Sequence, residues 1–156
     1  LADLLALGRE LVHDQPSPLL ATVATLTGHV YRAYGPYVGV VGNKKSGAAC
    51  ERIAALGESF GELCERSFAR REDYAFVAAR PPSEDVVSSN RMPSVSTPRG
   101  HQFPYAFLDI AAGLRNSGLP FVHVDIAGVA VDPPDWQFGK PTGVPVATLT
   151  TLVAEG

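Results

Sequence analysis

Three short apolar runs, far apart in the chain, constrain the fold of these 156 residues more than any other feature. They lie at residues 19–25, 38–41 and 121–127, and each contains β-branched side chains. Short, continuous apolar runs of this kind are typical of strands that are buried on both faces. The segments between them are long enough for helical crossovers, which join parallel strands. The sequence therefore predicts an α/β fold of three layers, in which a mostly parallel sheet is flanked by helices.

Helical spacing of apolar residues predicts five helices, and Ser46 and Thr142-Gly143 are expected to cap the second and the last of them. A Pro- and Ser-rich loop over 80–104 separates the third helix from the fourth, and a loop of this length is often functional. A Pro/Asp loop is expected at 132–135. The helices are expected over about residues 1–13, 47–57, 65–79, 104–115 and 144–153.

Composition narrows the classes of function. The chain has 13 Lys and Arg against 16 Asp and Glu, a net charge of −3, so it shows no general attraction to nucleic acid or to an anionic membrane. Apolar residues make up 46% and no run approaches the 18 residues of a membrane span. The two cysteines form no disulfide framework, and we expect buried thiols in a reducing compartment.

The first residues begin inside a helical pattern. The chain opens with Leu1, not Met, and no Ser, Thr, Asp or Asn precedes the pattern as a cap. We therefore expect these residues to be the C-terminal piece of a longer protein, part of whose working site lies elsewhere.

The sequence offers no self-contained catalytic motif. There is no G-x-S-x-G elbow, no phosphate-binding glycine loop and no pair of histidines at metal-ligand spacing. His123 and Asp125 lie two apart on an expected strand, so they share a face and form either a ligand pair or a hydrogen-bonded structural unit. The basic residues Arg66, Arg70 and Arg71 are expected on a solvated helix face.

Two segments are the best candidates for a binding site. Residues 24–28 and 125–128 each follow a predicted buried strand and contain small residues. Ligands of open α/β sheets bind outside the carboxyl ends of the strands, and glycine lets them approach the backbone closely. The alternative, that each segment is only a tight strand-to-helix turn, is equally compatible with the pattern.

The same segments resemble the leucyl aminopeptidase family of two-metal exopeptidases. Residues 24–28 read A-T-L-T-G, residues 123–128 match H-x-D-I-A-G, residues 142–149 match T-G-x-x-x-x-x-L, and residues 1–5 are similar to the family's L-A-D-A-L stretch. The resemblance covers nearly the whole chain in order, and residues 99–104 are typical of a divergent subgroup.

This resemblance implies a cytoplasmic metallo-aminopeptidase, usually a homo-oligomer of six copies, that removes N-terminal residues from peptides with two divalent metal ions, Zn or Mn. The 156 residues would be the C-terminal portion of its catalytic domain. The resemblance implies that Leu26 holds substrate or a bicarbonate base through its backbone. It also implies that the pocket for the N-terminal side chain is formed by Thr25, Gly28, Ala127 and Ala130.

The positions at which this sequence departs from the family pattern also bear on function. Its metal ligands and catalytic Lys and Arg lie in the motifs K-x-x-x-x-D and N-T-D-A-E-G-R and in an Asp between them, and none of these stands in this chain. Ala130 replaces a larger side chain of some members, which predicts a roomier pocket. We therefore expect neither catalytic nor metal-ligating residues in this chain, and we expect the chain alone to be inactive.

Three hypotheses remain. The chain is part of an active aminopeptidase whose metal-binding portion lies upstream, or part of an inactive relative used as a scaffold or assembly subunit. In the third hypothesis it is an unrelated α/β binding module. The residues before Leu1 would discriminate the first two.

Overall fold

The computed structural model describes residues 1–88, 92–132 and 139–155. Its main sheet has four strands in the order β1-β4-β2-β3, in which β1 pairs in parallel with β4, and β2 in parallel with β3. Only the central pair, β2 and β4, is antiparallel. The mostly parallel sheet predicted from the sequence is thus confirmed. The strands are β1 (Leu20–Ala24), β2 (Val38–Gly42), β3 (Cys64–Phe68) and β4 (Phe121–Asp125), and a separate antiparallel ribbon joins β5 (Val131–Asp132) to β6 (Lys140–Pro141).

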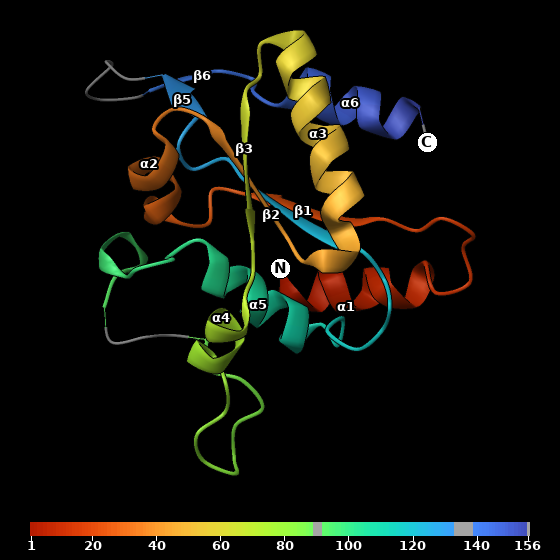
Figure 1. Cartoon of the computed structure of the whole chain (residues 1–156), viewed down its shortest axis with the longest axis vertical. Helices are drawn as coiled ribbons and strands as arrows, with labels where there is room; N and C mark the ends of the chain where they lie inside the picture. Colours follow the sequence, from red (N-terminus) through yellow and green to blue (C-terminus); the bar gives the residue numbers. More distant parts are fainter. Residues whose placement is uncertain (89–91, 133–138, 156) are drawn as a thin grey trace.

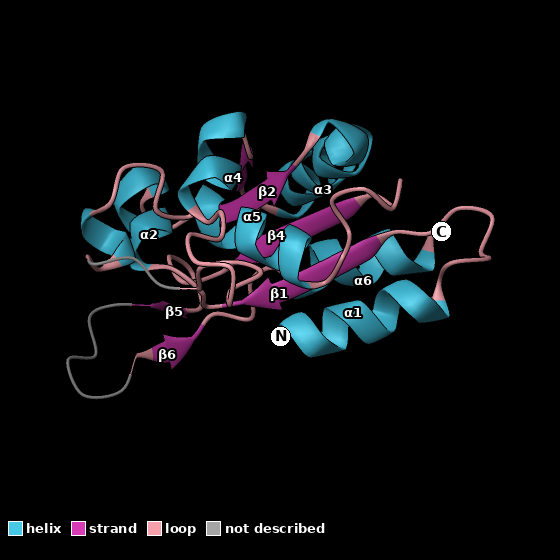
Figure 2. Cartoon of the chain, turned by 90° about the horizontal axis from the view of Figure 1, so that it is seen from below, coloured by secondary structure: helices cyan, strands magenta, loops and turns pink. Residues whose placement is uncertain are grey.

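Helices cover both faces of this sheet, as the α/β prediction requires. Helices α3 and α6 lie on one side, and α1 and α5 lie on the other (Figure 1). Helix α1 runs beside the edge strand β1 (Figure 2). The helices are α1 (Ala2–Leu11), α2 (Gly28–Tyr34), α3 (Gly47–Phe60), α4 (Arg71–Phe76), α5 (Gln102–Ala111) and α6 (Val146–Ala154), with short 3-10 turns η1 (Lys44–Ser46) and η2 (Ser94–Ser96).

Alternation along the strands divides the core into two layers. Val122 and Val124 of β4 pack with α3 and α6, whereas Phe121 points to the opposite layer formed with α1 and α5. There the Tyr105 ring stacks on Phe121 with centroids 4.8 Å apart. Because side chains alternate, His123 and Asp125 share the face of Phe121 and point toward α1 and α5.

The predicted helix over 65–79 is wrong. Residues Cys64–Phe68 form strand β3, and only Arg71–Phe76 form a helix. Parallel pairing with β2 overrides the weak helical pattern, because it satisfies the backbone of the edge strand. The three arginines consequently share no helix face: Arg66 on β3 pairs with Glu51 at 3.2 Å.

The helix predicted from Pro104 exists, but it begins at Gln102 and turns a different face inward. Of the expected stripe, Leu114 is buried beyond the helix, whereas Phe107 and Ile110 are only partly buried and Ala111 is exposed. The buried side chains include Tyr105, Ala106 and Leu108. The stripe was wrong because α5 is apolar on two sides, so periodicity could not show which side meets the sheet.

The predicted caps also differ in detail. Ser46 stands at the N-cap position of α3, but its hydroxyl accepts from Asn43 N at 2.9 Å and does not cap the helix. Helix α6 begins at Val146, and Glu62 accepts its first free amides, Ala147 N at 3.3 Å and Thr148 N at 2.7 Å. A carboxylate from a distant loop therefore replaces the expected local cap. Most of the Pro/Asp loop expected at 132–135 lies outside the described residues.

Within the described residues, no helix is long and apolar enough to cross a membrane. Both cysteines are free thiols, with Cys50 buried and Cys64 partly buried. Burial raises the pKa of both thiols above the ordinary value, that of Cys64 to about 11. Neither therefore has the depressed pKa of a reactive nucleophile.

Candidate functional site

The two candidate segments lie side by side. Strands β1 and β4 run parallel with Ala24 opposite Asp125, so both chains leave the sheet at the same edge. The pairing continues one residue further, where Ile126 N donates to Ala24 O at 3.0 Å. Both segments follow strands, as expected, but only β4 is buried throughout: in the edge strand β1, Ala21 and Val23 are exposed. The edge at which the two segments meet is the one where α/β proteins bind ligands.

One buried carboxylate holds the two segments together. Asp125 is fully buried, and its Oδ1 accepts from Leu26 N at 3.2 Å and from Ala127 N at 3.1 Å. Its Oδ2 accepts from Thr27 Oγ1 at 2.7 Å. Three hydrogen bonds to one buried carboxylate restrict the backbone of both segments, the one that follows β1 and the one that follows β4. Asp125 is therefore a structural clamp within the described chain, a role that the sequence pattern did not show.

The first segment leads directly into α2. Thr27 is the N-cap of α2, and its hydroxyl oxygen accepts from Val30 N at 3.4 Å while donating to Asp125. The same hydroxyl thus joins the helix start to the clamp. Any displacement of α2 is transmitted to the segment that precedes it.

The predicted substrate-contacting residues do not all line one cavity. An open apolar recess of about 740 Å³ lies between this segment, the start of α1 and the first turns of α5, and Leu26 is the only one of the five that lines it. Thr25, Leu26 and Gly28 are exposed, whereas Ala127 and Ala130 are partly buried in the turn after β4. The clamp brings Leu26 and Ala127 to one carboxylate oxygen, and no described bond joins Ala130 to Thr25 or Gly28.

His123 and Asp125 share a face but perform separate tasks. His123 Nδ1 lies 2.8 Å from Thr22 Oγ1 across the β1–β4 pair, and both side chains are buried. Burial lowers the pKa of His123, so the ring is neutral. No described bond joins His123 to Asp125: His123 contacts Thr22, and Asp125 binds the segments that follow β1 and β4.

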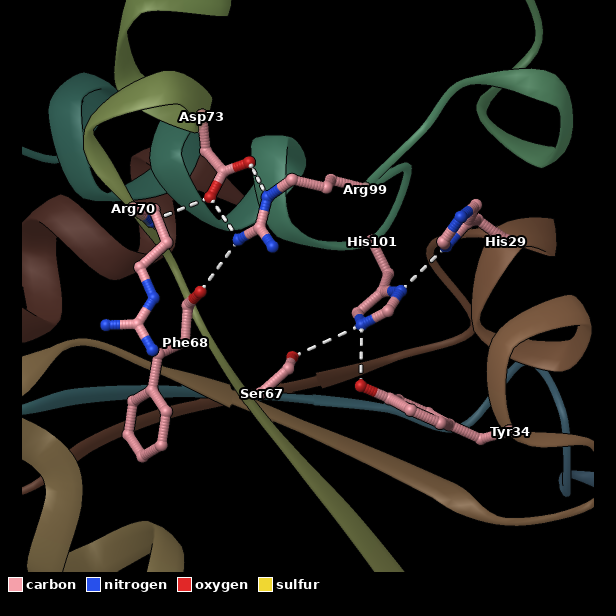
Figure 3. Close-up of polar contacts among 8 residues, drawn as sticks. All are labelled: His29, Tyr34, Ser67, Phe68, Arg70, Asp73, Arg99 and His101. Atoms are coloured by element: carbon pink, nitrogen blue, oxygen red, sulfur yellow. Dashed lines mark hydrogen bonds and ion pairs between the residues drawn. The ribbon is translucent and has the colours of Figure 1, made fainter.

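The sequence did not predict a cluster of four polar side chains that lies apart from the Asp125 clamp. We call this cluster the His101 hub, and its members are His29, Tyr34, Ser67 and His101. The Nδ1 atoms of His29 and His101 lie 2.7 Å apart, and His101 Nε2 lies 3.2 Å from both Ser67 Oγ and Tyr34 OH (Figure 3). His101 is buried, with 1% of its surface exposed. The hub joins residues from α2, β3 and the start of α5, and nothing in the sequence pairs histidines 72 positions apart.

Next to the hub, Arg99 anchors the end of the 80–104 loop. Its Nε donates to Asp73 Oδ1 at 2.7 Å and its Nη2 donates to Asp73 Oδ2 at 2.6 Å and to Phe68 O at 2.9 Å (Figure 3). Asp73 also accepts from Arg70 N at 2.7 Å. Arg99 has a φ of 58°, a left-handed conformation that is uncommon for a residue with a Cβ. The bidentate ion pair with buried Asp73 holds it there.

The described residues do not fit a pair of metal ions. None of them forms a group of three or more His, Cys, Asp or Glu that could hold a metal. The Nδ1 atoms of His29 and His101 face each other at 2.7 Å, so neither of these two atoms is free for a metal ion. Metal chemistry would therefore require ligands from outside the described residues.

Comparison with known proteins identifies the family. The profile of the cytosol aminopeptidase family, catalytic domain, matches residues 1–150. A Caenorhabditis elegans protein named "Putative aminopeptidase W07G4.4" is 38% identical over 161 aligned residues, which cover 97% of this chain. The chain spans 29% of the length of that relative. This chain thus belongs to the cytosol aminopeptidase family.

Proposed function

We propose that these residues are the C-terminal portion of a metallo-aminopeptidase of the leucyl aminopeptidase type, which removes N-terminal residues from peptides. In this proposal the chain contributes the substrate-side wall of the cleft, formed by Thr25, Leu26, Gly28, Ala127 and Ala130. Membership of the aminopeptidase family supports a peptidase role. The single observation that carries the proposed wall is the Asp125 clamp, which fixes two family motifs at the ligand-binding edge of the sheet.

The clamp suits a binding wall because it restricts the backbone before any ligand arrives. A preorganised wall loses less conformational entropy when substrate binds. Leu26 is 39% exposed although its amide is tied to Asp125, so the segment presents an apolar side chain from a restricted backbone. Such a surface would bind the substrate near its N-terminal residue and position it, without itself providing an acid or a base.

Two divalent ions, Zn or Mn, are part of this proposal, and they would activate water for attack on the peptide bond. The residues that the structure describes do not fit them, and in this proposal the ligands come from an upstream portion of the same protein. Cytoplasmic location and assembly into a homo-oligomer, six copies by resemblance to the family, remain predictions. Sedimentation velocity of the polypeptide that carries these residues would test the assembly.

Hydrolysis of leucine amide tests the proposed activity. We expect the polypeptide that carries these residues to release leucine in the presence of Mn²⁺ or Zn²⁺, and to lose this activity when a chelator removes the metal. Hydrolysis that persists undiminished with chelator would contradict the metal requirement. Absence of hydrolysis with either ion, in a folded protein, would favour the alternative function as an inactive scaffold or assembly subunit.

Pocket size tests the proposed wall separately. Replacing Ala130 with Met fills space in the proposed pocket, so we expect KM for leucine amide to rise more than KM for alanine amide. The control is Ala55→Met on the exposed surface of α3, which should change neither constant. An equal change in KM for both substrates in Ala130→Met would contradict the assignment of Ala130 to the proposed wall.

A further inference from the structure

His101 joins three elements through one buried side chain. It contacts His29 near the start of α2, Tyr34 at the end of α2, and Ser67 on β3. The rings of His29 and Tyr34 each lie with centroids 5.0 Å from that of His101. Because α2 has only seven residues, His101 holds both ends of this helix against the sheet.

The backbone around His101 is held equally closely. A Cβ at Gly100 would lie 2.8 Å from His29 Cβ and would also collide with the carbonyl of Ser94, so glycine is required for this approach. Arg99, which precedes Gly100, forms an ion pair with Asp73 and so attaches this part of the chain to α4. The segment 99–101 is thus fixed toward α4 on one side and toward α2 on the other (Figure 3).

We propose that His101 is a positioning residue, which acts through His29 to hold α2 and the attached segment Thr25–Gly28 in the geometry that receives substrate. The path is continuous: His101 contacts His29 on α2, Thr27 caps α2, and Asp125 clamps Thr27 and Leu26. The positioning role rests on the proposed function, because it assumes that Thr25–Gly28 contacts the substrate.

The coupling between the two histidines depends on their protonation. A bond between two Nδ1 atoms needs one N–H and one lone pair, so it survives with both rings neutral or with one added proton. With both rings protonated, two N–H groups face each other and the bond is lost. The groups that act electrostatically on the pair are Arg32 of α2, Arg99, Asp73 of α4 and His123 of β4.

The surroundings oppose protonation. Burial, then the charges of His29 and Arg99, lower the pKa of His101 to about 4, and burial and Arg32 lower the pKa of His29. Asp73 acts in the opposite direction, but it is already paired with Arg99. The His29–His101 bond is therefore intact at neutral pH and should break near pH 4.

Substitution of His29 separates positioning from titration. In His29→Ala the bond is absent, whereas in His29→Asn the amide oxygen occupies nearly the place of Nδ1 and cannot titrate. Hydrogen exchange at the amides of Leu26 and Val30 measures how often this segment opens, because these amides donate to Asp125 and to Thr27. Val124 in central strand β4 serves as the internal reference.

We expect His29→Ala to lower the protection factors of Leu26 and Val30 about tenfold at pH 7, the effect of losing one buried hydrogen bond, with Val124 unchanged. His29→Asn should restore them. On acidification through pH 4, wild-type protection should fall while His29→Asn retains it. The matched control is His13→Ala, at an exposed histidine after α1.

Unchanged protection at Leu26 and Val30 in His29→Ala would overturn the proposal, whether or not the protein hydrolyses peptides. If His29→Ala fails to fold, the proposal is tested by comparing wild type with His29→Asn. An equal loss of protection in the two proteins on acidification through pH 4 would then overturn the proposal. Reduced protection supports the coupling even where leucine amide is not hydrolysed, and in that case only the proposed function fails. In an active enzyme, His29→Ala should raise KM with kcat unchanged, because the segment binds substrate without reacting.

Discussion

Asp125 shows how one side chain converts two sequence motifs into one structural unit. Its carboxylate is buried at the end of a central strand and accepts three hydrogen bonds from the two segments that follow β1 and β4. The sequence pattern suggested for Asp125 either a ligand pair or a structural unit with His123. The contacts instead assign it to holding the backbone, because Leu26, Thr27 and Ala127 already occupy its oxygens.

Asp125→Asn tests this clamp. The amide oxygen can still accept from the two backbone N–H groups, but the amide nitrogen then donates to Thr27, whose hydroxyl proton loses its charged acceptor. The variant should therefore lose about 1–3 kcal/mol of unfolding free energy. Urea unfolding at pH 7 measures the difference. Asp14→Asn, at an exposed site, should leave stability unchanged. A loss no greater than that of Asp14→Asn would show that the carboxylate is not a clamp.

The hub predicts a pH dependence of stability. Because the pKa of His101 is about 4 in the fold against an ordinary 6.5, the unfolded chain binds the proton first as pH falls. Stability is therefore full above pH 6.5 and declines between 6.5 and 4, by up to about 1.4 kcal/mol per pH unit from this group. Urea unfolding at pH 7, 6 and 5 should show a shallower decline in His101→Gln, and the wild-type decline in His13→Gln. Equal slopes in wild type and His101→Gln would refute this assignment.

Two helices, α1 and α6, have no N-cap side chain of their own and are held by distant partners. Helix α1 has no side-chain N-cap, and α6 obtains its N-terminal acceptor from Glu62, outside the helix. Helix α1 remains attached through Leu5, which is 4% exposed and packs in the layer with α5 and β1, while Leu4 beside it is 71% exposed. Its stability therefore depends on tertiary packing rather than on local signals.

Paired substitutions on α1 measure this dependence. Leu5→Ala should cost about 2–5 kcal/mol of unfolding free energy, because it leaves a cavity in the core. Leu4→Ala changes the intrinsic helix propensity by the same amount, because both variants replace Leu with Ala. Its unfolding free energy should nevertheless stay within about 0.5 kcal/mol of wild type. Thermal or urea unfolding of both variants would check the contrast. Similar losses at the two positions would mean that the outer face of α1 is also covered.

At the scale of the whole molecule, the described residues form the proposed binding edge but no cluster of metal-ligating side chains. The ligand-binding edge, the apolar recess and the His101 hub are formed by described residues, yet these contain no group of three metal-ligating side chains. The chain also spans 29% of its Caenorhabditis elegans relative. Substrate contact and metal chemistry are thus separable properties of different segments in the proposed enzyme.

The 156-residue chain by itself should consequently neither retain two metal ions nor hydrolyse leucine amide. Metal content after dialysis against Mn²⁺ or Zn²⁺, together with an amide-hydrolysis assay, measures both properties. The polypeptide that, in the proposal, joins these residues to the metal ligands serves as the positive control. Stoichiometric metal and chelator-sensitive hydrolysis in the short chain would contradict this separation.

Local patterns predicted a large part of the fold. The apolar runs at 19–25, 38–41 and 121–127 correspond to β1, β2 and β4. Burial on both faces accounts for the runs of β2 and β4, whereas β1 lies at the edge of the sheet with Ala21 and Val23 exposed. Strand β3 was missed, since its sequence Cys-Glu-Arg-Ser-Phe is polar and its conformation follows from pairing with β2. Propensity is a weak signal where neighbours supply the hydrogen bonds.

By itself, then, the sequence determined the class of fold, the strands of its centre and the two motif segments at their ends, because these depend on side-chain period and on short-range turns. Only the tertiary structure decided that Asp125 clamps the segments, that Leu26 alone of the predicted wall lines the recess, and that His29 meets His101. Those contacts join residues 72 to 99 positions apart. Such pairs are created by the packing of elements, which no local pattern records.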